Sequence, residues 1–401
     1  MKTAADSNSA GFPPEPRART IILVVSHTYV VALNRKKLTL LAEFPCLDLA
    51  LAVPLVWTDM GRNILLQRVD EARYAVHPVR NGGHRHLHLS WFAPLELFAV
   101  FCKVRPDVVY IEEEPQSLSA WQAVVLAKVF AAKIVLFTWE NLPANYRWYR
   151  RPAARFILRT IDVLVGGSKE AVAVCRSLGY RGRANVTPQL GLDPDEFAPR
   201  ASRRLADRLG LAGSFVIGYV ARLIPEKGIL VLLEAAAQLD FDFRLLIVGD
   251  GPARVQARRR AQELGITERV VWTGAVPHER VPDYLNCMDT FVLPSQRTRN
   301  EMEQFGHVVI EAMACGVATV GADTGAIPGL IGDAGLVFPA KDALALAGCL
   351  RRLHDDAQLR QTLAESGRQR VLKRYTNAVV AGRMYDIIRA TVAGLPPGCN
   401  G

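Results

Sequence analysis

The stretch that decides the fold runs from Glu303 to Gly316 and reads EQFGHVVIEAMACG. Its polar start, the glycine Gly306 and the apolar run that follows are typical of a tight turn into a helix packed against a sheet. The start of such a helix presents free N–H groups and partial positive charge, where an anion can bind. Glu303 precedes the helix and Glu311 lies about two turns further on, so the two carboxylates can contact two parts of one elongated ligand but cannot chelate one atom. Sugar hydroxyls can donate to both, although on spacing alone a buried helix with a solvated acidic cap is the simpler interpretation.

Strand patterns alternate with helix patterns along the rest of the chain. Apolar runs of strand length lie at 20–26, 107–111, 133–137 and 161–165 in the first half, and at 215–220, 244–249, 270–274 and 290–294 in the second. This alternation predicts parallel, doubly wound sheets. A segment rich in Pro and Gly separates the two sets near residue 200. We therefore expect two Rossmann-like domains that face each other across a cleft.

The charge balance favours anionic partners. The 401 residues include 49 Lys and Arg against 39 Asp and Glu, a net charge of +10, which suits nucleotide sugars, phospholipid headgroups or nucleic acid. No aromatic–basic run, zinc-finger spacing or obvious helix-turn-helix accompanies this charge, so we expect no nucleic-acid partner. The apolar stretches are broken by charges and prolines, and the seven cysteines are scattered. A cytoplasmic protein is the resulting expectation.

Three motifs in the second half together resemble glycosyltransferase family 4, the retaining GT-B enzymes also called group 1 glycosyl transferases. They are the Glu303–Glu311 pair with its Glu-x7-Glu spacing, the segment GDAGLVF at 332–338, and the loop GYVARLIPEKG at 218–228. The resemblance is strong over 185–390 and weak over 20–184. It implies a GT-B fold with an N-terminal acceptor-side domain at 20–199, a C-terminal nucleotide-sugar-binding domain at 200–375, and a helix at 376–401 that returns to the N-terminal domain. Residues 1–19 are rich in small, polar and Pro residues, which predicts a disordered tail.

The resemblance also implies a donor site. Glu311 would hydrogen-bond the ribose of the nucleotide. Glu303 would contact the hydroxyls of the donor sugar, with the backbone N–H groups of Phe305, Gly306 and His307 nearby.

The loop at 218–228 would complete that site. Arg222 and Lys227 would stabilise the leaving diphosphate, because a guanidinium binds it as a fork and an ammonium as a compact charge. Gly218 opens the same loop and is included among the donor-binding residues. With these cations in place no metal and no separate cofactor is expected, and the nucleotide sugar is a co-substrate.

Glu140 stands where many members of the family carry a histidine close to the reacting sugar, so we assign it a positioning role at the catalytic centre.

Two interpretations stay open for the acidic run Glu112-Glu113-Glu114, which follows a predicted strand: ligand-binding carboxylates at the carboxyl end of a sheet, or a solvated acidic loop. Two also stay open for the Arg-rich and aromatic segment 147–159: a peripheral contact with the inner face of a membrane, or a helix with a solvated basic face.

The resemblance implies a retaining glycosyltransferase that moves a sugar from a nucleotide sugar to a hydroxyl acceptor. A UDP-sugar is the favoured donor, and the acceptor is lipid-linked, a phospholipid or a secondary metabolite. A GT-B-fold nucleotide-sugar epimerase and a non-catalytic sugar-nucleotide-binding protein are the alternatives.

Overall fold

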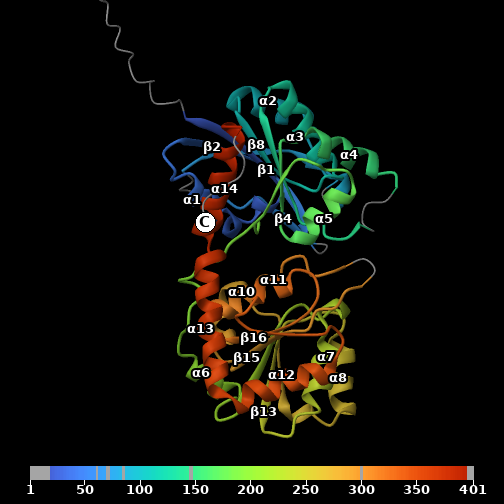
Figure 1. Cartoon of the computed structure of the whole chain (residues 1–401), viewed down its shortest axis with the longest axis vertical. Coiled ribbons are helices and arrows are strands. Elements are labelled where there is room, and N and C mark those ends of the chain that lie inside the picture. Colours follow the sequence, from blue (N-terminus) through green and yellow to red (C-terminus); the bar gives the residue numbers. More distant parts are fainter. Residues whose placement is uncertain are drawn as a thin grey trace, which may run out of the picture.

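The structure is a computed structural model that describes residues 19–59, 62–68, 73–83, 86–143, 148–298 and 301–394. The predicted disordered tail, apart from Arg19, lies outside the described residues. Two domains stand one above the other, and the C-terminal helices run along one side of both (Figure 1).

The first domain is built on a seven-stranded sheet in the order β11-β10-β9-β8-β1-β2-β5, with every neighbouring pair parallel. Its central strands are almost continuously apolar because helices cover both faces of the sheet; in β1 five of the seven residues are buried. The strands are β1 Thr20–Ser26, β2 Leu47–Pro54, β5 Ala75–Val79, β8 Val108–Glu112, β9 Lys133–Thr138, β10 Val163–Gly166 and β11 Arg183–Val186. The helices are α1 Lys36–Leu41, α2 Pro94–Val104, α3 Leu118–Val129, α4 Arg151–Thr160 and α5 Lys169–Ser177.

Two short hairpins are attached to this domain. The antiparallel pair β3 Val56–Asp59 and β4 Arg62–Leu65 directly follows β2. Figure 1 places β4 at the edge of the upper domain that faces the lower one. The second pair is β6 Asn81–Gly82 with β7 Trp91–Phe92.

The second domain carries six parallel strands in the order β14-β13-β12-β15-β16-β17. The strands are β12 Phe215–Val220, β13 Phe243–Val248, β14 Val270–Gly274, β15 Thr290–Leu293, β16 Ala318–Ala322 and β17 Leu336–Phe338. The helices are α6 Arg203–Arg208, α7 Ile229–Ala236, α8 Arg254–Glu263, α9 Val281–Leu285, α10 His307–Ala314, α11 Ile327–Ile331, α12 Ala343–Asp355 and α13 Ala357–Arg374. The predicted fold class, α/β with two parallel sheets, is confirmed.

Each sheet has one point where the strand order reverses direction. In the first sheet it lies between β1 and β8, and in the second between β12 and β15. Loops leaving two such strands diverge to opposite faces, and ligands of open α/β sheets bind in the crevice between them at the carboxyl ends. The two reversal points therefore mark where binding residues should be sought.

The chain returns to the first domain after α13, and the last helix, α14 Asn377–Val392, lies against that domain (Figure 1). Ala381, Met384 and Ile388 are buried in the same apolar cluster as the β1 residues Ile22 and Val24. The segment between α13 and α14 is hydrogen-bonded to the earlier connection between the domains. The N–H of Leu192 donates to the carbonyl of Tyr375, and the N–H of Asn377 donates to the carbonyl of Leu192, each at 2.9 Å. Within the described stretches no helix combines the length and the apolar character needed to cross a membrane.

Candidate active site

The loop after β15 leads into α10 through a left-handed residue. Gly306 caps α10 with φ 88° and ψ 57°, a conformation that glycine adopts at little cost. The helix then buries its apolar residues, and Glu311 is carried inside with them at 9% exposure. The turn predicted at Gly306 and the packed helix after it are therefore both present.

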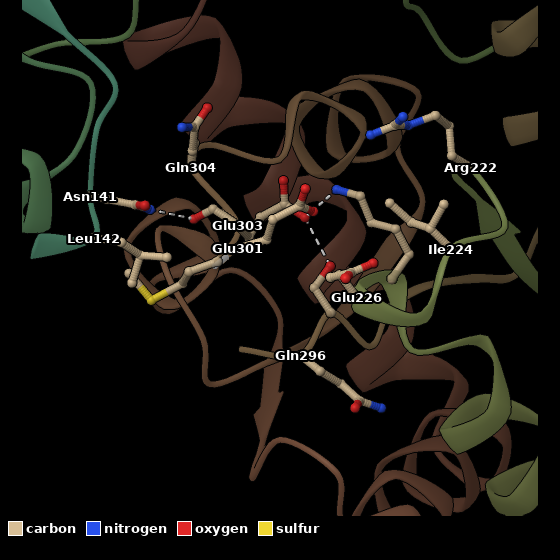
Figure 2. A pocket seen from close by; sticks show the side chains of 12 residues that line it. Asn141, Leu142, Arg222, Ile224, Glu226, Gln296, Glu301, Glu303 and Gln304 are labelled. Carbon is tan, nitrogen blue, oxygen red and sulfur yellow. Dashed lines mark hydrogen bonds and ion pairs between the residues drawn. The ribbon is translucent and has the colours of Figure 1, made fainter. Parts of the chain in front are cut away.

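Glu303 is held by one partner from its own loop and by two from other loops (Figure 2). Its Oε2 lies 2.6 Å from Lys227 Nζ and accepts a hydrogen bond of 2.8 Å from Ser295 Oγ. Its backbone carbonyl accepts a bond of 3.1 Å from Asn141 Nδ2, which belongs to the first domain. The carboxylate is only 9% exposed, and Lys227 is 25% exposed. One residue thus joins the loops that follow β12, β15 and β9.

The loop after β12 carries Arg222 and Lys227. It is pinned to the loop after β15 at Gly228, which has φ 70° and whose α-carbon faces the backbone of Pro294. A β-carbon there would lie 1.8 Å from the Pro294 carbonyl oxygen. The two loops that flank the reversal point of the second sheet are therefore held in direct contact, with both cations on one side.

Two adjoining cavities, each of about 350 Å³, open at this point. Both are lined by Arg222, Lys227, Glu303 and Gln304, so these side chains stand on the wall between them. Each also includes first-domain residues, Asn141 and Leu142 in one and Trp139 in the other, so the cavities lie in the cleft. The first has the further lining residues Ile224, Glu226, Ser295, Gln296, Glu301 and Met302, and the second Val220, Ala221, Phe305, Gly306, His307 and Val308.

Glu311 has a different neighbour. Its Oε1 lies 3.2 Å from His278 Nε2, and the His278 ring also packs on Phe197 at 5.5 Å between centroids. The hydrogen bond to Glu311, helped by the negative charges of Glu311, Glu196 and Glu279, raises the pKa of His278 despite partial burial. Glu311 does not line either of the two cavities.

The aromatic wall of the second cavity comes from both domains. The ring of Trp139 packs on Phe305 at 5.5 Å and on His307 at 6.3 Å between centroids. Burial lowers the pKa of His307, which favours its neutral form. Among the residues that the structure describes, none hydrogen-bonds its buried Nε2. His307 therefore lies in the cleft with one unused ring nitrogen.

Gly218 lies away from this cleft. It sits in the middle of β12, where a β-carbon would come within 1.9 Å of Met288 Sδ. Close packing between the strand and Met288 accounts for the glycine, and it lines neither cavity.

Glu140 is buried beside the cleft without lining either cavity, although Trp139, Asn141 and Leu142 around it do. Its Oε1 accepts a bond of 3.1 Å from the backbone N–H of Leu142. Burial, together with the nearby charge of Glu140, raises the pKa of Glu114 to about 7, although the hydrogen bonds that Glu114 accepts from Thr138 and Trp139 lower it. The two carboxyls thus lie close together behind the loop that forms the first-domain wall.

The acidic run is buried, so the solvated-loop interpretation is wrong. Glu112, Glu113 and Glu114 are 2%, 2% and 8% exposed. Glu112 Oε1 lies 2.7 Å from Lys37 Nζ, Glu113 Oε1 lies 2.9 Å from His27 Nδ1, and Glu114 Oε1 accepts a bond of 3.0 Å from the N–H of Trp139.

Three residues of the site were given no role by the sequence: Ser295, Asn141 and His278. Ser295 lies two residues past the end of β15 and Asn141 three residues past the end of β9. Polar residues near the carboxyl ends of parallel strands are the signal that could have found them. His278 lies 33 residues before its partner Glu311, and no local pattern links the two.

Comparison with known proteins agrees with this geometry. The family model described as "Glycosyl transferases group 1" matches residues 204–370. This region of the chain belongs to the group 1 glycosyl transferases. The predicted membership of this family is thereby confirmed, and the match covers most of the second domain.

Two curated relatives illustrate the breadth of the family. The chain is 31% identical over 255 residues to a GDP-mannose-dependent alpha-(1-6)-phosphatidylinositol monomannoside mannosyltransferase of Mycolicibacterium smegmatis, covering 60% of this chain and 66% of that protein. It is 32% identical over 202 residues to an alpha-D-kanosaminyltransferase of Streptomyces kanamyceticus, covering 49% of this chain and 50% of the relative. The matches therefore span between half and two thirds of these relatives' own length.

A solved structure of similar fold covers most of the chain. The Anabaena protein HepE, solved in complex with UDP, superposes with a TM-score of 0.75 at 17% identity, over 92% of this group 1 glycosyl transferase and 100% of HepE. At that identity the likeness concerns the fold alone.

In the described part of the chain, no group of three or more His, Cys, Asp or Glu side chains is arranged to hold a metal ion.

Proposed function

We propose that this protein is a glycosyltransferase that moves a sugar from a nucleotide sugar to a hydroxyl acceptor. The observation that carries the proposal is the cluster of Lys227, Glu303 and Ser295, with Arg222 on the same cavity wall, at the reversal point of the second sheet. Family membership supports the same activity.

Arg222 and Lys227 would stabilise the leaving diphosphate. Departure of this group leaves a developing positive charge on the sugar and adds negative charge to the phosphate, so fixed cations beside the phosphate lower the barrier. Lys227 need not leave Glu303 to do so, because an ammonium group has three N–H donors. Glu303 would meanwhile accept hydrogen bonds from hydroxyls of the donor sugar.

The proposed reaction retains the configuration at the anomeric carbon. The bond from that carbon to the phosphate oxygen breaks, and its electron pair leaves with the nucleoside diphosphate. The acceptor oxygen bonds to the carbon on the same face, and its proton passes to the departing phosphate. The support for this stereochemistry is the family resemblance.

A UDP-sugar is the first donor to test, because a protein of the same fold binds UDP, and GDP-mannose is the second, because it is the donor in the name of one relative. The names of relatives point to two acceptor classes, a phosphatidylinositol mannoside and the aminocyclitol 2-deoxystreptamine.

The surface around α4 supports the lipid class. Trp148 is 80% exposed, and Tyr149 and Phe156 are about half exposed. The helix carries three exposed arginines and no acid, and arginines beside aromatic residues suit an anionic bilayer interface. Arg147, the start of the predicted segment, lies outside the described residues.

A thermal-shift screen tests the donor site. Nucleotide sugars are added at 100 to 1,000 times Kd, which should stabilise the fold by roughly 3–4 kcal/mol. Stabilisation by one of them that is lost in Lys227→Ala but kept in Lys373→Ala, an exposed lysine on α13, supports the proposal. No stabilisation by any nucleotide or nucleotide sugar would overturn it.

Turnover then separates the alternatives. A transferase releases one nucleoside diphosphate for each acceptor molecule that it glycosylates. An epimerase consumes the nucleotide sugar without releasing nucleoside diphosphate. A binding protein does neither.

A further inference from the structure

The first sheet has its own reversal point, between β1 and β8, and the proposed donor site does not use it. His27 directly follows β1, and Glu113 directly follows β8. The two residues are therefore placed where an open parallel sheet binds a ligand.

Glu113 fixes the position of His27 through two hydrogen bonds. Its Oε1 lies 2.8 Å from the His27 backbone nitrogen and 2.9 Å from Nδ1, while its Oε2 accepts a bond of 3.0 Å from Ser119 Oγ. A carboxylate on Nδ1 holds the proton on that nitrogen and leaves Nε2 for another partner. None of the described residues bonds Nε2, and the His27 side chain is 21% exposed.

An aromatic ring lies beside this histidine. Trp57, in the hairpin that follows β2, stacks on His27 with 4.0 Å between centroids and an interplanar angle of 28°. Since β2 is the other neighbour of β1, three adjacent strands place Trp57, His27 and Glu113 side by side at their carboxyl ends.

This group is connected to the wall of the donor cavity. Thr28, next to His27, accepts a bond of 3.0 Å from Gln189 Nε2, and Gln189 Oε1 accepts one of 2.8 Å from Trp139 Nε1. Trp139 lines the second cavity. Strands β1 and β9 are two positions apart in the sheet, which corresponds to about 10 Å, so one acceptor molecule can reach both.

We propose that Trp57 and His27 form an acceptor subsite for a ring-shaped polyol, a hexopyranose or a cyclitol. The indole packs against the C–H face of the ring, and His27 Nε2 hydrogen-bonds one ring hydroxyl, which can donate to a neutral imidazole or accept from a protonated one. Glu113 is a positioning residue. The inference rests on the proposed transferase function.

Two cyclitol probes test it on the full-length protein saturated with UDP: neutral myo-inositol and the amine-bearing 2-deoxystreptamine. Binding is measured by saturation-transfer NMR, and UDP affinity is measured in parallel. In His27→Asn the amide nitrogen replaces Nδ1 and keeps the bond to Glu113, but the free nitrogen is lost. We expect this variant and Trp57→Ala to bind the preferred probe at least tenfold more weakly, with unchanged UDP affinity and melting temperature in His27→Asn. Trp121→Ala, an exposed tryptophan on α3, is the matched control and should bind the probe as the wild type does.

The outcomes separate this inference from the proposed function. Preference for one probe distinguishes a neutral from a cationic acceptor. Equal probe binding in His27→Asn, Trp57→Ala and wild type, or no binding of either probe to the wild type, overturns the subsite. If the wild type binds neither UDP nor GDP, the result counts instead against the donor site.

Discussion

Each domain carries a lysine–glutamate pair at the carboxyl end of its sheet, and the two pairs differ in solvent access. Lys37 and Glu112 of the first domain lie 2.7 Å apart with side chains only 2% and 0% exposed. Lys227 and Glu303 of the second lie 2.6 Å apart with 25% and 9% exposure, on the wall of two cavities. The same chemistry therefore has two uses: a sealed pair fixes a helix to a strand end, and an open pair is available to a ligand.

The largest effect on folding is expected from breaking the sealed pair. Lys37→Met removes the cation and leaves Glu112 buried with Gln189 as its remaining partner. Removing one partner of a buried pair typically costs about 3–5 kcal/mol. Urea unfolding should show this loss, and Lys37→Met/Glu112→Gln should recover most of it. A loss below about 1 kcal/mol would contradict the sealed character of the pair.

The open pair should instead affect turnover. Lys227→Met removes one cation from the proposed leaving-group site, and loss of one such electrostatic contact commonly lowers kcat by about 10²- to 10³-fold. Its unfolding free energy should change less than in Lys37→Met, because water reaches Glu303. Steady-state kinetics with the donor found in the screen measures the effect. Activity within tenfold of the wild type would remove Lys227 from the proposed mechanism.

The open pair also depends on the backbone contact that holds its two loops. Gly228→Ala places a methyl group against the Pro294 carbonyl at a left-handed position. Gly213→Ala is the control, since φ there is +80° but nothing lies within 4 Å of a β-carbon. The left-handed backbone alone costs about 1–2 kcal/mol, so both variants should lose that much. Gly228→Ala should lose more in urea unfolding and should also bind the donor more weakly. Equal losses would mean that the loops are not pinned there.

The sequence predicts the second domain's site more fully than the first's. Arg222 and Lys227 are in one short loop, and Glu303 and Glu311 are in one continuous stretch. Residues so close in the sequence must also lie near each other in the fold, so a local motif can predict them together. The parallel sheets follow from apolar strands such as β1. Glu112 and Lys37 are 75 residues apart, and Glu113 and His27 are 86 apart. The pairing of these residues depends on which strands become neighbours in the sheet. No local sequence pattern predicts that order of strands.

Gly218 and Glu140 show the same limit. The partner that explains Gly218 is Met288, 70 positions further along the chain, and Glu140 directs an oxygen to the backbone of Leu142. The Gly218 contact arises from tertiary packing and has no signature in residue spacing. The Glu140 bond is local, two residues apart, but it depends on the course of a loop that no periodic pattern predicts.

The smallest effect concerns a third, half-exposed pair, His278 and Glu311. Because the pKa of His278 is raised in the folded protein, the protonated ring contributes stability at low pH, and this contribution is lost as the pH rises through that pKa. The family resemblance implies that the nucleotide ribose hydrogen-bonds Glu311, and such a ribose would have to compete with the protonated ring. We therefore expect UDP affinity to fall as the pH is lowered from 8 to 6. Since His278 is 46% exposed and solvent weakens such pairs to below about 1 kcal/mol, the change should be at most about fivefold.

Calorimetric titration of UDP at both pH values measures this dependence. His278→Gln should flatten it, whereas His354→Gln, which removes a histidine paired with Asp355 far along the chain, should leave it in place. If His278→Gln binds UDP with the wild-type pH profile, Glu311 is not competed for by the ribose. The more exposed His278–Glu311 pair would then play no part in the donor site, and the comparison would rest on the sealed and open lysine–glutamate pairs alone.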